Sequence, residues 1–187
     1  MDKEKKVKHL FLGKKLPSLP IIFTELRTVM ERPYVSNRHI AEVIKKDQSL
    51  MAKILKLSNS ALYGKRQEIT ELSNAITYLG ATTLKGIVLQ ISLINLFKSK
   101  SNLIPDFKPS AFWEHSIGTA FFAEMLAKEL SLPKNENYYI AGLLHDIGKL
   151  LIFHVYPDEF EDIVLKQIGS DSNNFEAEQE ILGVDHT

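Results

Sequence analysis

The sequence predicts an all-α protein, a multi-helix bundle in which an N-terminal helical half packs on a second helical half. Long stretches of the sequence contain no proline, and within these stretches apolar residues recur at three- and four-residue spacings, as on one face of a helix. The alternating pattern bounded by Asn-Gly or Asp-Gly that is typical of β-hairpins is missing. With 187 residues, 44% of them hydrophobic, the chain can build one core or two apposed halves.

The first half is expected to contain short helices separated by capping and turn residues. Ser36 and Asp47 are predicted N-caps, Gly80 stops a helix, and Tyr63-Gly64 marks a turn. The helices are expected over residues 20–30, 36–44, 47–59 and 72–79, and from Thr82 or Thr83 to about Phe97.

The second half follows a linker-like stretch, Lys98 to Pro109. Its helices are expected over residues 111–130, 138–153, 157–168 and 175–182. We therefore divide the chain into a basic N-terminal tail (1–15), expected to be solvated, and a domain (16–187) with subdomains 16–104 and 105–187.

Composition narrows the class of function. Lys plus Arg and Asp plus Glu are 23 each, so no net field attracts nucleic acid or an anionic membrane. The absence of cysteine excludes a disulfide scaffold, a thiolate metal site and a Cys nucleophile, and it fits a cytoplasmic location. Polar residues interrupt the longest apolar stretch, Gly86 to Phe97, so no membrane span is expected.

The segment AGLLHDIGKLLIF places His145 and Asp146 side by side in a nearly apolar helix. A buried carboxylate is costly unless a cation, a hydrogen-bond network or a metal compensates it. Imidazole and carboxylate together suit manganese, iron, nickel or zinc, and Lys149 could then meet a phosphate. Alternatively, Lys149 pairs with Asp146 at i,i+3 and His145 donates to a backbone carbonyl; the residues alone leave both interpretations open.

His115 and His186 are the other candidate metal ligands. A plain antiparallel hairpin would place His145 opposite about residue 122, which leaves His115 roughly 10 Å away along the axis at 1.5 Å per residue. Only a steep crossing or a helix break would bring the two together. For His9, in the basic tail, and His39, near the start of a short helix, we favour structural roles, and likewise for His154, near the end of its helix, where the dipole favours a cation.

Two further patterns favour core packing over binding. The helix–Gly80–helix segment has the outline of a DNA-binding helix-turn-helix, but its second helix is mostly apolar and offers only Lys85 in its first two turns. The aromatic cluster Phe112, Trp113, Phe121 and Phe122 is likewise predicted to lie in the core.

The chain resembles the HDOD family, helical relatives of HD phosphohydrolases found in bacterial signalling proteins. The resemblance runs from about residue 16 to the end, and LSNSALYG (57–64) followed by AITYLG (75–80) is its most specific part. HDIGKL (145–150) and ILGVDH (181–186) extend it. His115, His145, Asp146 and Lys149 stand where metal-dependent HD enzymes have them.

The resemblance implies a bacterial regulatory module that binds a signalling protein or a nucleotide without turnover. The alternative is a metal-dependent phosphodiesterase acting on a nucleotide such as cyclic di-GMP. In either case the implied metal ligands are His115, His145, Asp146 and His186, and in the alternative Asp146 and Lys149 are catalytic. Because HD enzymes continue with further helices and a final Asp ligand, we expect the chain to be C-terminally short.

Overall fold

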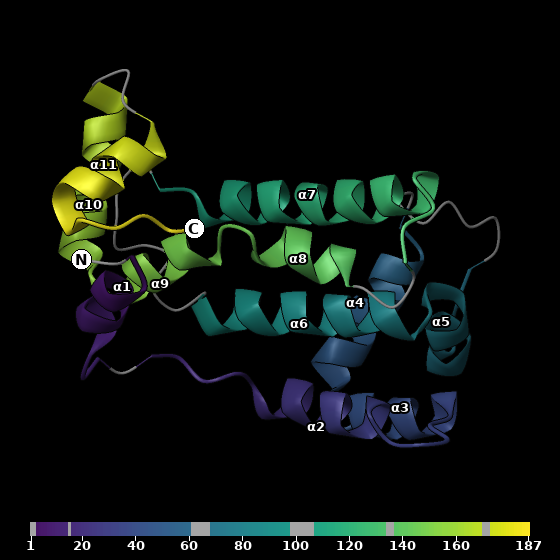
Figure 1. The fold of residues 1–187 in the computed structure, drawn as a ribbon. Coiled ribbons are helices and arrows are strands. Elements are labelled where there is room, and N and C mark those ends of the chain that lie inside the picture. The colour runs from purple at the N-terminus through teal and green to yellow at the C-terminus, as the bar shows by residue number, and fades with distance from the viewer. Residues whose placement is uncertain (1–2, 15, 61–67, 98–106, 134–136, 170–172) are drawn as a thin grey trace. The chain divides into compact units, whose positions relative to one another are not determined.

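The structure is a computed structural model that describes residues 3–14, 16–60, 68–97, 107–133, 137–169 and 173–187. These residues form α-helices joined by turns, with no strand among them, which confirms the predicted all-α class (Figure 1). The chain divides into two compact units, Leu19–Leu96 and a second unit made of Met1–Ser18 and Phe97–Thr187. The predicted boundary at residue 104 and residues 98–106 of the predicted linker lie outside the described residues.

The Leu19–Leu96 unit contains five helices close to the predicted positions. They are α2 (Ile21–Met30), α3 (Asn37–Ile44), α4 (Gln48–Ser58), α5 (Leu72–Leu79) and α6 (Ala81–Phe97), the last ending one residue beyond the unit. Helix α3 packs against α2, α4 and α5. The predicted N-caps are confirmed: Ser36 accepts from the His39 amide, and Asp47 from the Leu50 amide at 2.9 Å.

Asn59 ties the end of α4 to the chain that leads into α5. Its Nδ2 donates to the carbonyl oxygens of Leu55 at 3.0 Å and Ile69 at 2.8 Å. Its Oδ1 accepts from the Ile69 amide at 2.7 Å. The Asn of LSNSALYG therefore holds two separated backbone segments together, while the predicted Tyr63-Gly64 turn lies outside the described residues.

Gly80 separates α5 from α6 with φ 77°, a left-handed value that favours glycine. Most residues of α6 from Leu84 to Leu93 are buried, so this helix is a packing element, as predicted. Among the described residues no single helix has the length and apolar composition to cross a membrane, although α5 and α6, bent by 111°, together pass that test.

The second unit contains the helix pair α7 (Pro109–Glu129) and α8 (Tyr138–Leu144), which lie side by side (Figure 1). It also contains α9 (Ile147–Val155), α10 (Pro157–Gly169) and α11 (Asn174–Leu182). Helix α10 packs against both α9 and α11, and a buried cluster joins the three helices: Ile152, Phe153, Phe160, Ile163 and Ala177. Every predicted site residue lies on these five helices or on the segments that join and follow them.

The N-terminal segment differs from the expected solvated tail. It forms α1 (Lys3–Phe11), and the Phe11 ring packs edge-on against Tyr156, with ring centroids 6.1 Å apart. The Tyr156 hydroxyl donates to the Leu10 carbonyl, and Lys14 Nζ lies 4.8 Å from the centroid of the Tyr156 ring. Val7, Leu10 and Phe11 have helical spacing, but the surrounding lysines hid this apolar face in the sequence.

The predicted aromatic core is confirmed only in part. Trp113 is buried, whereas Phe122 is 62% exposed. Helix α7 has one face toward α8 and another toward solvent, so neighbouring aromatic residues in the sequence fall on different faces.

Candidate metal centre

His145 and Asp146 lie at a break between two helices, where one continuous helix from 138 to 153 was predicted. Helix α8 ends at Leu144, α9 begins at Ile147, and Asp146 has φ −107° and ψ 9°. The carboxylate occupies the N-cap position of α9 without accepting a capping hydrogen bond from that helix. It is therefore available to the side chains around it. No proline marks the break, so local patterns did not predict it.

Gly142 sets the register of α7 against α8. A Cβ atom at this position would lie 2.7 Å from Ala120 Cα and 2.8 Å from the Thr119 carbonyl oxygen, so only glycine allows this approach. Residue 142 thus lies opposite residues 119 and 120. In an antiparallel pair, three residues forward on one helix are opposite three residues back on the other, so residue 145 faces 116–117 rather than 122. The shifted register, with the helix break beside it, brings His145 to His115.

Gly148 admits the C-terminal segment to the same place. A Cβ atom on Gly148 would lie 2.2 Å from the His186 carbonyl oxygen, which leaves room for glycine alone. The segment after α11 therefore runs directly along the start of α9. This contact places the His186 imidazole, 3% exposed, beside Asp146.

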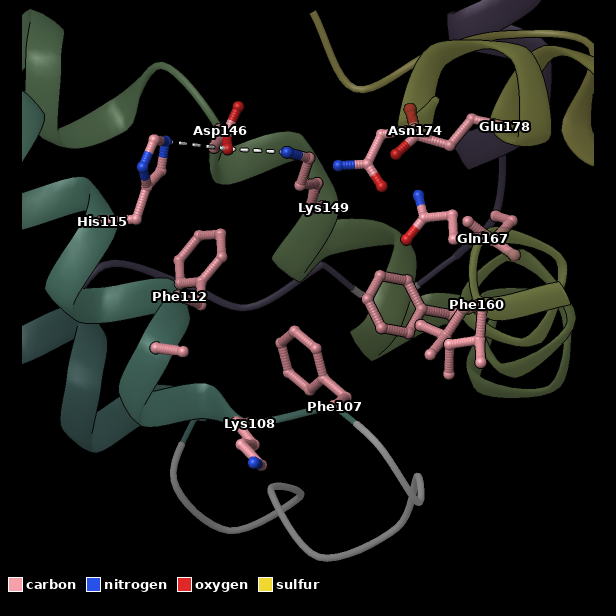
Figure 2. A pocket seen from close by; sticks show the side chains of 14 residues that line it. Phe107, Lys108, Phe112, His115, Asp146, Lys149, Phe160, Gln167, Asn174 and Glu178 are labelled. Atoms are coloured by element: carbon pink, nitrogen blue, oxygen red, sulfur yellow. Dashed lines mark hydrogen bonds and ion pairs between the residues drawn. The ribbon is translucent and has the colours of Figure 1, made fainter. Parts of the chain in front are cut away.

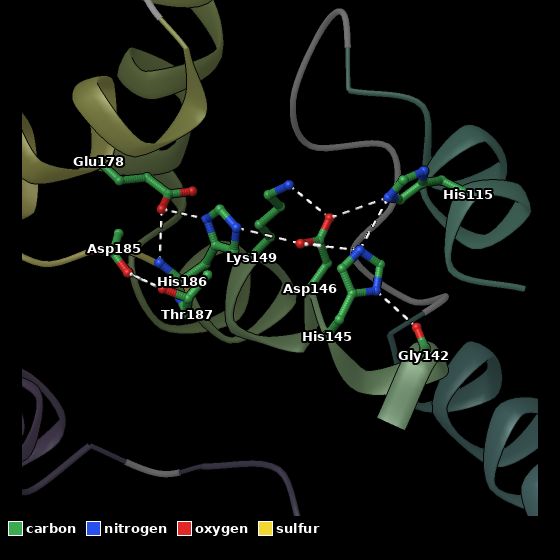
Figure 3. A network of polar contacts seen from close by, with 9 residues as sticks. All are labelled: His115, Gly142, His145, Asp146, Lys149, Glu178, Asp185, His186 and Thr187. Carbon is green, nitrogen blue, oxygen red and sulfur yellow. Dashed lines mark hydrogen bonds and ion pairs between the residues drawn. The ribbon is translucent and has the colours of Figure 1, made fainter. Parts of the chain in front are cut away.

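Three candidate ligand atoms converge at the break (Figure 3). His115, His145 and Asp146 each offer one atom, and these atoms lie within 4.8 Å of one another. His115 Nε2 is 3.1 Å from His145 Nε2, and His145 Nε2 is 3.4 Å from Asp146 Oδ1. Two imidazole nitrogens bound to one ion at about 2.0–2.1 Å are about 3.0–3.4 Å apart, so the pair fits a shared cation.

The tautomer of His145 supports the same interpretation. Its Nδ1 lies 2.8 Å from the Gly142 carbonyl oxygen, which can only accept, so Nδ1 carries the proton and donates it. In the neutral form of the ring this bond leaves Nε2 unprotonated and facing the site. A backbone carbonyl that fixes a histidine in this way is a common outer-shell feature of metal sites.

Asp146 is buried and surrounded by cationic or protonatable groups. Its side chain is 9% exposed, and Oδ2 accepts from Lys149 Nζ at 2.7 Å. Burial alone would raise the pKa of the carboxyl, but the hydrogen bond and charge of Lys149, with His145 and His186 nearby, hold this pKa below its usual value. The carboxylate is therefore ionised at neutral pH, as a metal ligand must be.

Both contacts of the non-metal interpretation are present. Lys149 pairs with Asp146, and His145 donates to a backbone carbonyl. They leave His115 Nε2 and His145 Nε2 facing each other, however, so they do not remove the ligand set. The two interpretations are compatible, because Lys149 uses Oδ2 of the carboxylate and the His145 carbonyl contact uses Nδ1.

His186 has a different environment from the other candidate ligands. Its Nε2 lies 3.3 Å from Asp146 Oδ1, and its Nδ1 lies 2.6 Å from Glu178 Oε2. The same Glu178 oxygen accepts from the His186 amide at 2.8 Å. The group of three mutually close ligand atoms found among the described residues does not include His186.

Glu178 is a candidate site residue that the sequence did not indicate. It is 1% exposed and connects through His186 to Asp146, as a buried carboxylate–imidazole–carboxylate chain (Figure 3). Glu176, Glu178 and Glu180 alternate along α11 and look alike in the sequence. The helical spacing of Glu178 to Leu182, one turn on, could have placed it on the inward face.

The remaining histidines are placed elsewhere. His39 forms a capping box with Ser36 at the start of α3, and the His154 ring packs against Phe97 with ring centroids 6.0 Å apart. His9 is exposed on α1. These positions agree with the structural roles that the sequence analysis favoured for them.

Two members of the ligand group (His115, His145 and Asp146), namely His115 and Asp146, border an open pocket of about 740 Å³ (Figure 2). His115, Asp146 and Lys149 line it on one side, and residues of α10 and α11 line it on the other. A pocket of this volume is in the range that takes a small molecule. The site thus combines a candidate cation position, a lysine ammonium and space for an anionic ligand.

A helical domain with a His-Asp pair in such a pocket is the class that includes HD phosphohydrolases and their relatives. The family model of the HDOD domain matches residues 16–187, and the chain belongs to the HDOD family. The LSNSALYG, AITYLG and HDIGKL segments all fall within the match.

Three solved structures are similar to the chain. An HDOD domain protein from Geobacter sulfurreducens is 28% identical with TM-score 0.84, and the match covers 98% of this chain and 61% of that one. A protein named as a candidate phosphohydrolase from Shewanella amazonensis SB2B is 25% identical with TM-score 0.73, covering 97% and 62%. A protein named for signal transduction from Marinobacter aquaeolei VT8, 19% identical with TM-score 0.72, covers 98% and 44% and shows the fold alone.

The chain is shorter than the proteins it resembles. It spans less than two thirds of each of these structures. It spans 30% of a curated relative, an uncharacterized protein of Treponema pallidum (strain Nichols), to which it is 28% identical over 159 residues.

Proposed function

We propose that this HDOD domain is a regulatory module that binds a phosphorylated small molecule through a divalent cation held by His115, His145 and Asp146. The observation that carries the proposal is the convergence of these ligand atoms on the wall of a pocket that also contains the Lys149 ammonium. Manganese, iron, nickel and zinc all suit two imidazoles and a carboxylate. His186, whose Nε2 lies 3.3 Å from Asp146 Oδ1, is proposed to hold that carboxylate or to join the ligand set.

The chain's own residues supply most of what such a ligand needs. Lys149 is 18% exposed and projects from α9 beside the ligand group, so it offers a cation to a phosphate oxygen. Asp146 keeps the lysine in place, and the Gly142 carbonyl orients His145. The cation, when bound, supplies Lewis acidity and a coordinated water of lowered pKa.

The regulatory part of the proposal rests on the family and on names. The resemblance to the HDOD family implies a role in signalling, and one structural neighbour is named for signal transduction. We propose that a signalling protein recognises the ligand-bound domain. A partner that binds equally well with and without ligand would contradict this part.

Calorimetry with named probes tests the proposal. Mn²⁺ is titrated into the protein, and inorganic phosphate or ribose 5-phosphate is then titrated into the Mn²⁺-loaded protein. We expect one Mn²⁺ to bind per chain, and we expect phosphate and ribose 5-phosphate to bind the Mn²⁺-loaded protein. Lys149→Gln should bind each of these phosphates at least about tenfold more weakly. Lys166→Gln, on α10, is the control. Failure of either probe to bind folded wild type would overturn the proposal.

The second candidate function is metal-dependent phosphoester hydrolysis. It is favoured by the small number of ligand atoms: His115, His145 and Asp146 provide three, which leaves positions for water and substrate. Hydrolysis of bis(p-nitrophenyl) phosphate would be followed with added Mn²⁺, Fe²⁺, Ni²⁺ or Zn²⁺. Turnover that disappears in His145→Ala supports this function, and binding without turnover in all four metals supports the regulatory one.

A further inference from the structure

One face of α7 is both apolar and exposed. Phe122, Met125 and Leu126 are each more than half exposed. Gly118 precedes them on the same face, and a Cβ atom at this position would meet no other atom within 4 Å. At 3.6 residues per turn these four positions fall within a sector of about 100° of the helix surface. Large apolar side chains gathered on one exposed face mark an interaction site.

The same face has a histidine at one end and a carboxylate at the other. His115 comes seven residues before Phe122, and Glu129 comes seven residues after it. Seven residues are close to two helical turns, so both side chains share the face with Phe122 and each lies about 10 Å from it along the axis. The His115 side chain is more than half exposed, and Glu129 is exposed. The face is therefore symmetric about Phe122 in position, with groups that can pair at its two ends.

The second ring nitrogen of His115 distinguishes this residue from the other histidines of the site. His145 Nδ1 lies 2.8 Å from the Gly142 carbonyl oxygen, and His186 Nδ1 lies 2.6 Å from Glu178 Oε2. His115 directs Nε2 to His145, and its Nδ1 lies on the side of the ring away from Asp146, where no described residue bonds to it (Figure 3). Histidines that bind a metal almost always donate this second N–H to a carboxylate, a carbonyl oxygen or water.

We infer that this face of α7 is the interface of a homodimer, in which α7 packs antiparallel on α7 of a second copy about a two-fold axis at Phe122. Positions equally far before and after residue 122 are then opposite each other. Phe122 meets its own copy, and Leu126 enters the open space at Gly118. Glu129 of the second copy lies opposite His115. A second copy is the occupant because the face is complementary to itself in shape and in charge, as a two-fold interface requires.

In this dimer the second copy completes the outer shell of the site. The axes of packed helices are about 8–10 Å apart, a distance that facing glutamate and histidine side chains can close. His115 Nδ1 then donates to the carboxylate of Glu129 of the second copy, and the same contact forms a second time across the axis. The role of Glu129 in positioning a metal ligand rests on the proposed function, whereas the dimer itself does not.

Disulfide trapping tests the position of the axis, because the chain contains no cysteine. A residue on a two-fold axis meets its own copy, so Phe122→Cys should form a disulfide-linked dimer on mild oxidation. Leu165→Cys, at a comparably exposed position of α10, is the control and should cross-link at least about tenfold more slowly.

Sedimentation of the untreated protein gives a second measurement. One helix face buries less than about 1,200 Å², so wild type should form a weak dimer that appears as its concentration rises through the micromolar range. Phe122→Glu places two like charges at the axis and should remain monomeric. Its urea midpoint at low concentration should match wild type, because the position is exposed.

Mn²⁺ affinity tests the role of Glu129. In the cross-linked Phe122→Cys dimer, adding Glu129→Ala removes the acceptor of His115 Nδ1 and should weaken Mn²⁺ binding by about tenfold or more. In the reduced and dilute monomer the same substitution should leave Mn²⁺ affinity unchanged. Glu180→Ala, at an exposed position of α11, is the control and should have no effect in either state.

The outcomes separate this inference from the proposed function. If Phe122→Cys cross-links no faster than Leu165→Cys, or if wild type stays monomeric or Phe122→Glu still dimerises, the dimer is overturned, the face belongs to another partner and the proposed function stands. A dimer whose Mn²⁺ affinity is insensitive to Glu129→Ala would overturn the contact with His115. If neither monomer nor dimer binds Mn²⁺, the proposed function fails, and cross-linking still decides the dimer.

Discussion

Asp146 is the residue on which the charge balance of the site depends. Because Asp146 stands in an apolar segment, the sequence predicted that a partner compensates its charge. It did not decide whether that partner is a metal or Lys149. The structure supplies Lys149 at 2.7 Å and the imidazoles of His145 and His186 at 3.4 and 3.3 Å. A compensated carboxylate of this kind is inexpensive to keep ionised and costly to replace.

The first prediction concerns Asp146→Asn. The amide keeps the shape of the side chain but leaves the Lys149 ammonium, 18% exposed, without its anion. We expect Mn²⁺ binding to be lost and the free energy of unfolding to fall by about 1–3 kcal/mol, measured by urea denaturation. Asp162→Asn, on the exposed surface of α10, should change stability by less than about 0.5 kcal/mol. Equal effects of the two variants would contradict this account of Asp146.

The second prediction concerns Glu178→Gln. Both hydrogen bonds from His186 go to one oxygen of Glu178, so the amide oxygen can still accept them, but the substitution removes the buried charge that fixes the imidazole against Asp146. Outer-shell changes of this kind cost about 10- to 100-fold in metal affinity, and we expect a loss in that range for Mn²⁺. The control on the same helix is Glu180→Gln, an exposed position, which should bind Mn²⁺ as wild type does. Unchanged affinity in Glu178→Gln would show that the carboxylate–imidazole chain does not support the metal centre.

At the scale of elements, the contact between α7 and α8 could not be predicted from the sequence. The positions of the helices were predicted from the spacing of apolar residues, and His115 and His145 were predicted as candidate ligands from their residue type. Their contact did not, because it depends on a register that Gly142 sets by close packing against Thr119 and Ala120. Spacing along one helix carries no information about such a register.

The third prediction tests this register with two glycines of the same hairpin. Gly142→Ala introduces a Cβ atom 2.7 Å from the Ala120 backbone, so we expect a loss of about 1–3 kcal/mol in stability and weaker Mn²⁺ binding. Gly118→Ala, in the interior of α7 with open space around it, should instead stabilise the protein by about 0.5–1 kcal/mol. Urea denaturation measures both. The register would be wrong if Gly142→Ala were as stable as Gly118→Ala.

The fourth prediction concerns the motif residue Asn59 in the other unit. Asn59→Ala removes three hydrogen bonds, two of which join the end of α4 to Ile69, and two backbone groups of Ile69 lose their partner. We expect a loss of about 1–3 kcal/mol in the free energy of unfolding. Asn59→Asp keeps the acceptor and should lose less. If both variants matched wild type, the motif would have no role in holding these segments.

The N-terminal helix and the break at His145 mark the limits of prediction from local patterns. Lysines concealed the apolar face of α1, and its packing on Tyr156 is a contact between residues far apart in the sequence. The break between α8 and α9 has no proline, so it is visible only once α7 and the C-terminal segment are in place. Tertiary contacts decided both features.

At the scale of the whole molecule, the candidate site belongs entirely to one of the two compact units. His115, His145, Asp146, Glu178 and His186 all lie within Phe97–Thr187. The family, the helical class and the approximate helices of both units could be predicted from the sequence. The His186–Glu178 chain and the pocket wall on α10 could not, because they arise where the C-terminal segment meets α9.

The fifth prediction follows from this division. A ligand stabilises the states that bind it, by about 2.7 kcal/mol at a hundredfold excess over Kd. Saturating Mn²⁺ should therefore slow the hydrogen exchange of those amides in α8 and α9 that exchange through local opening. Amides of α3 and α4 should exchange at their metal-free rates. Protection confined to α3 and α4 would place the cation elsewhere in the molecule.

The central claim is that His115, His145 and Asp146 hold a divalent cation, and a Mn²⁺ titration followed by electron paramagnetic resonance tests it most directly. Wild type and His9→Ala, a change on the exposed surface of α1, should each bind one Mn²⁺ per chain. His145→Ala should remain folded and bind none. Folded wild type that leaves all Mn²⁺ free in solution, or a His145→Ala variant that binds it as tightly as wild type, would contradict the account.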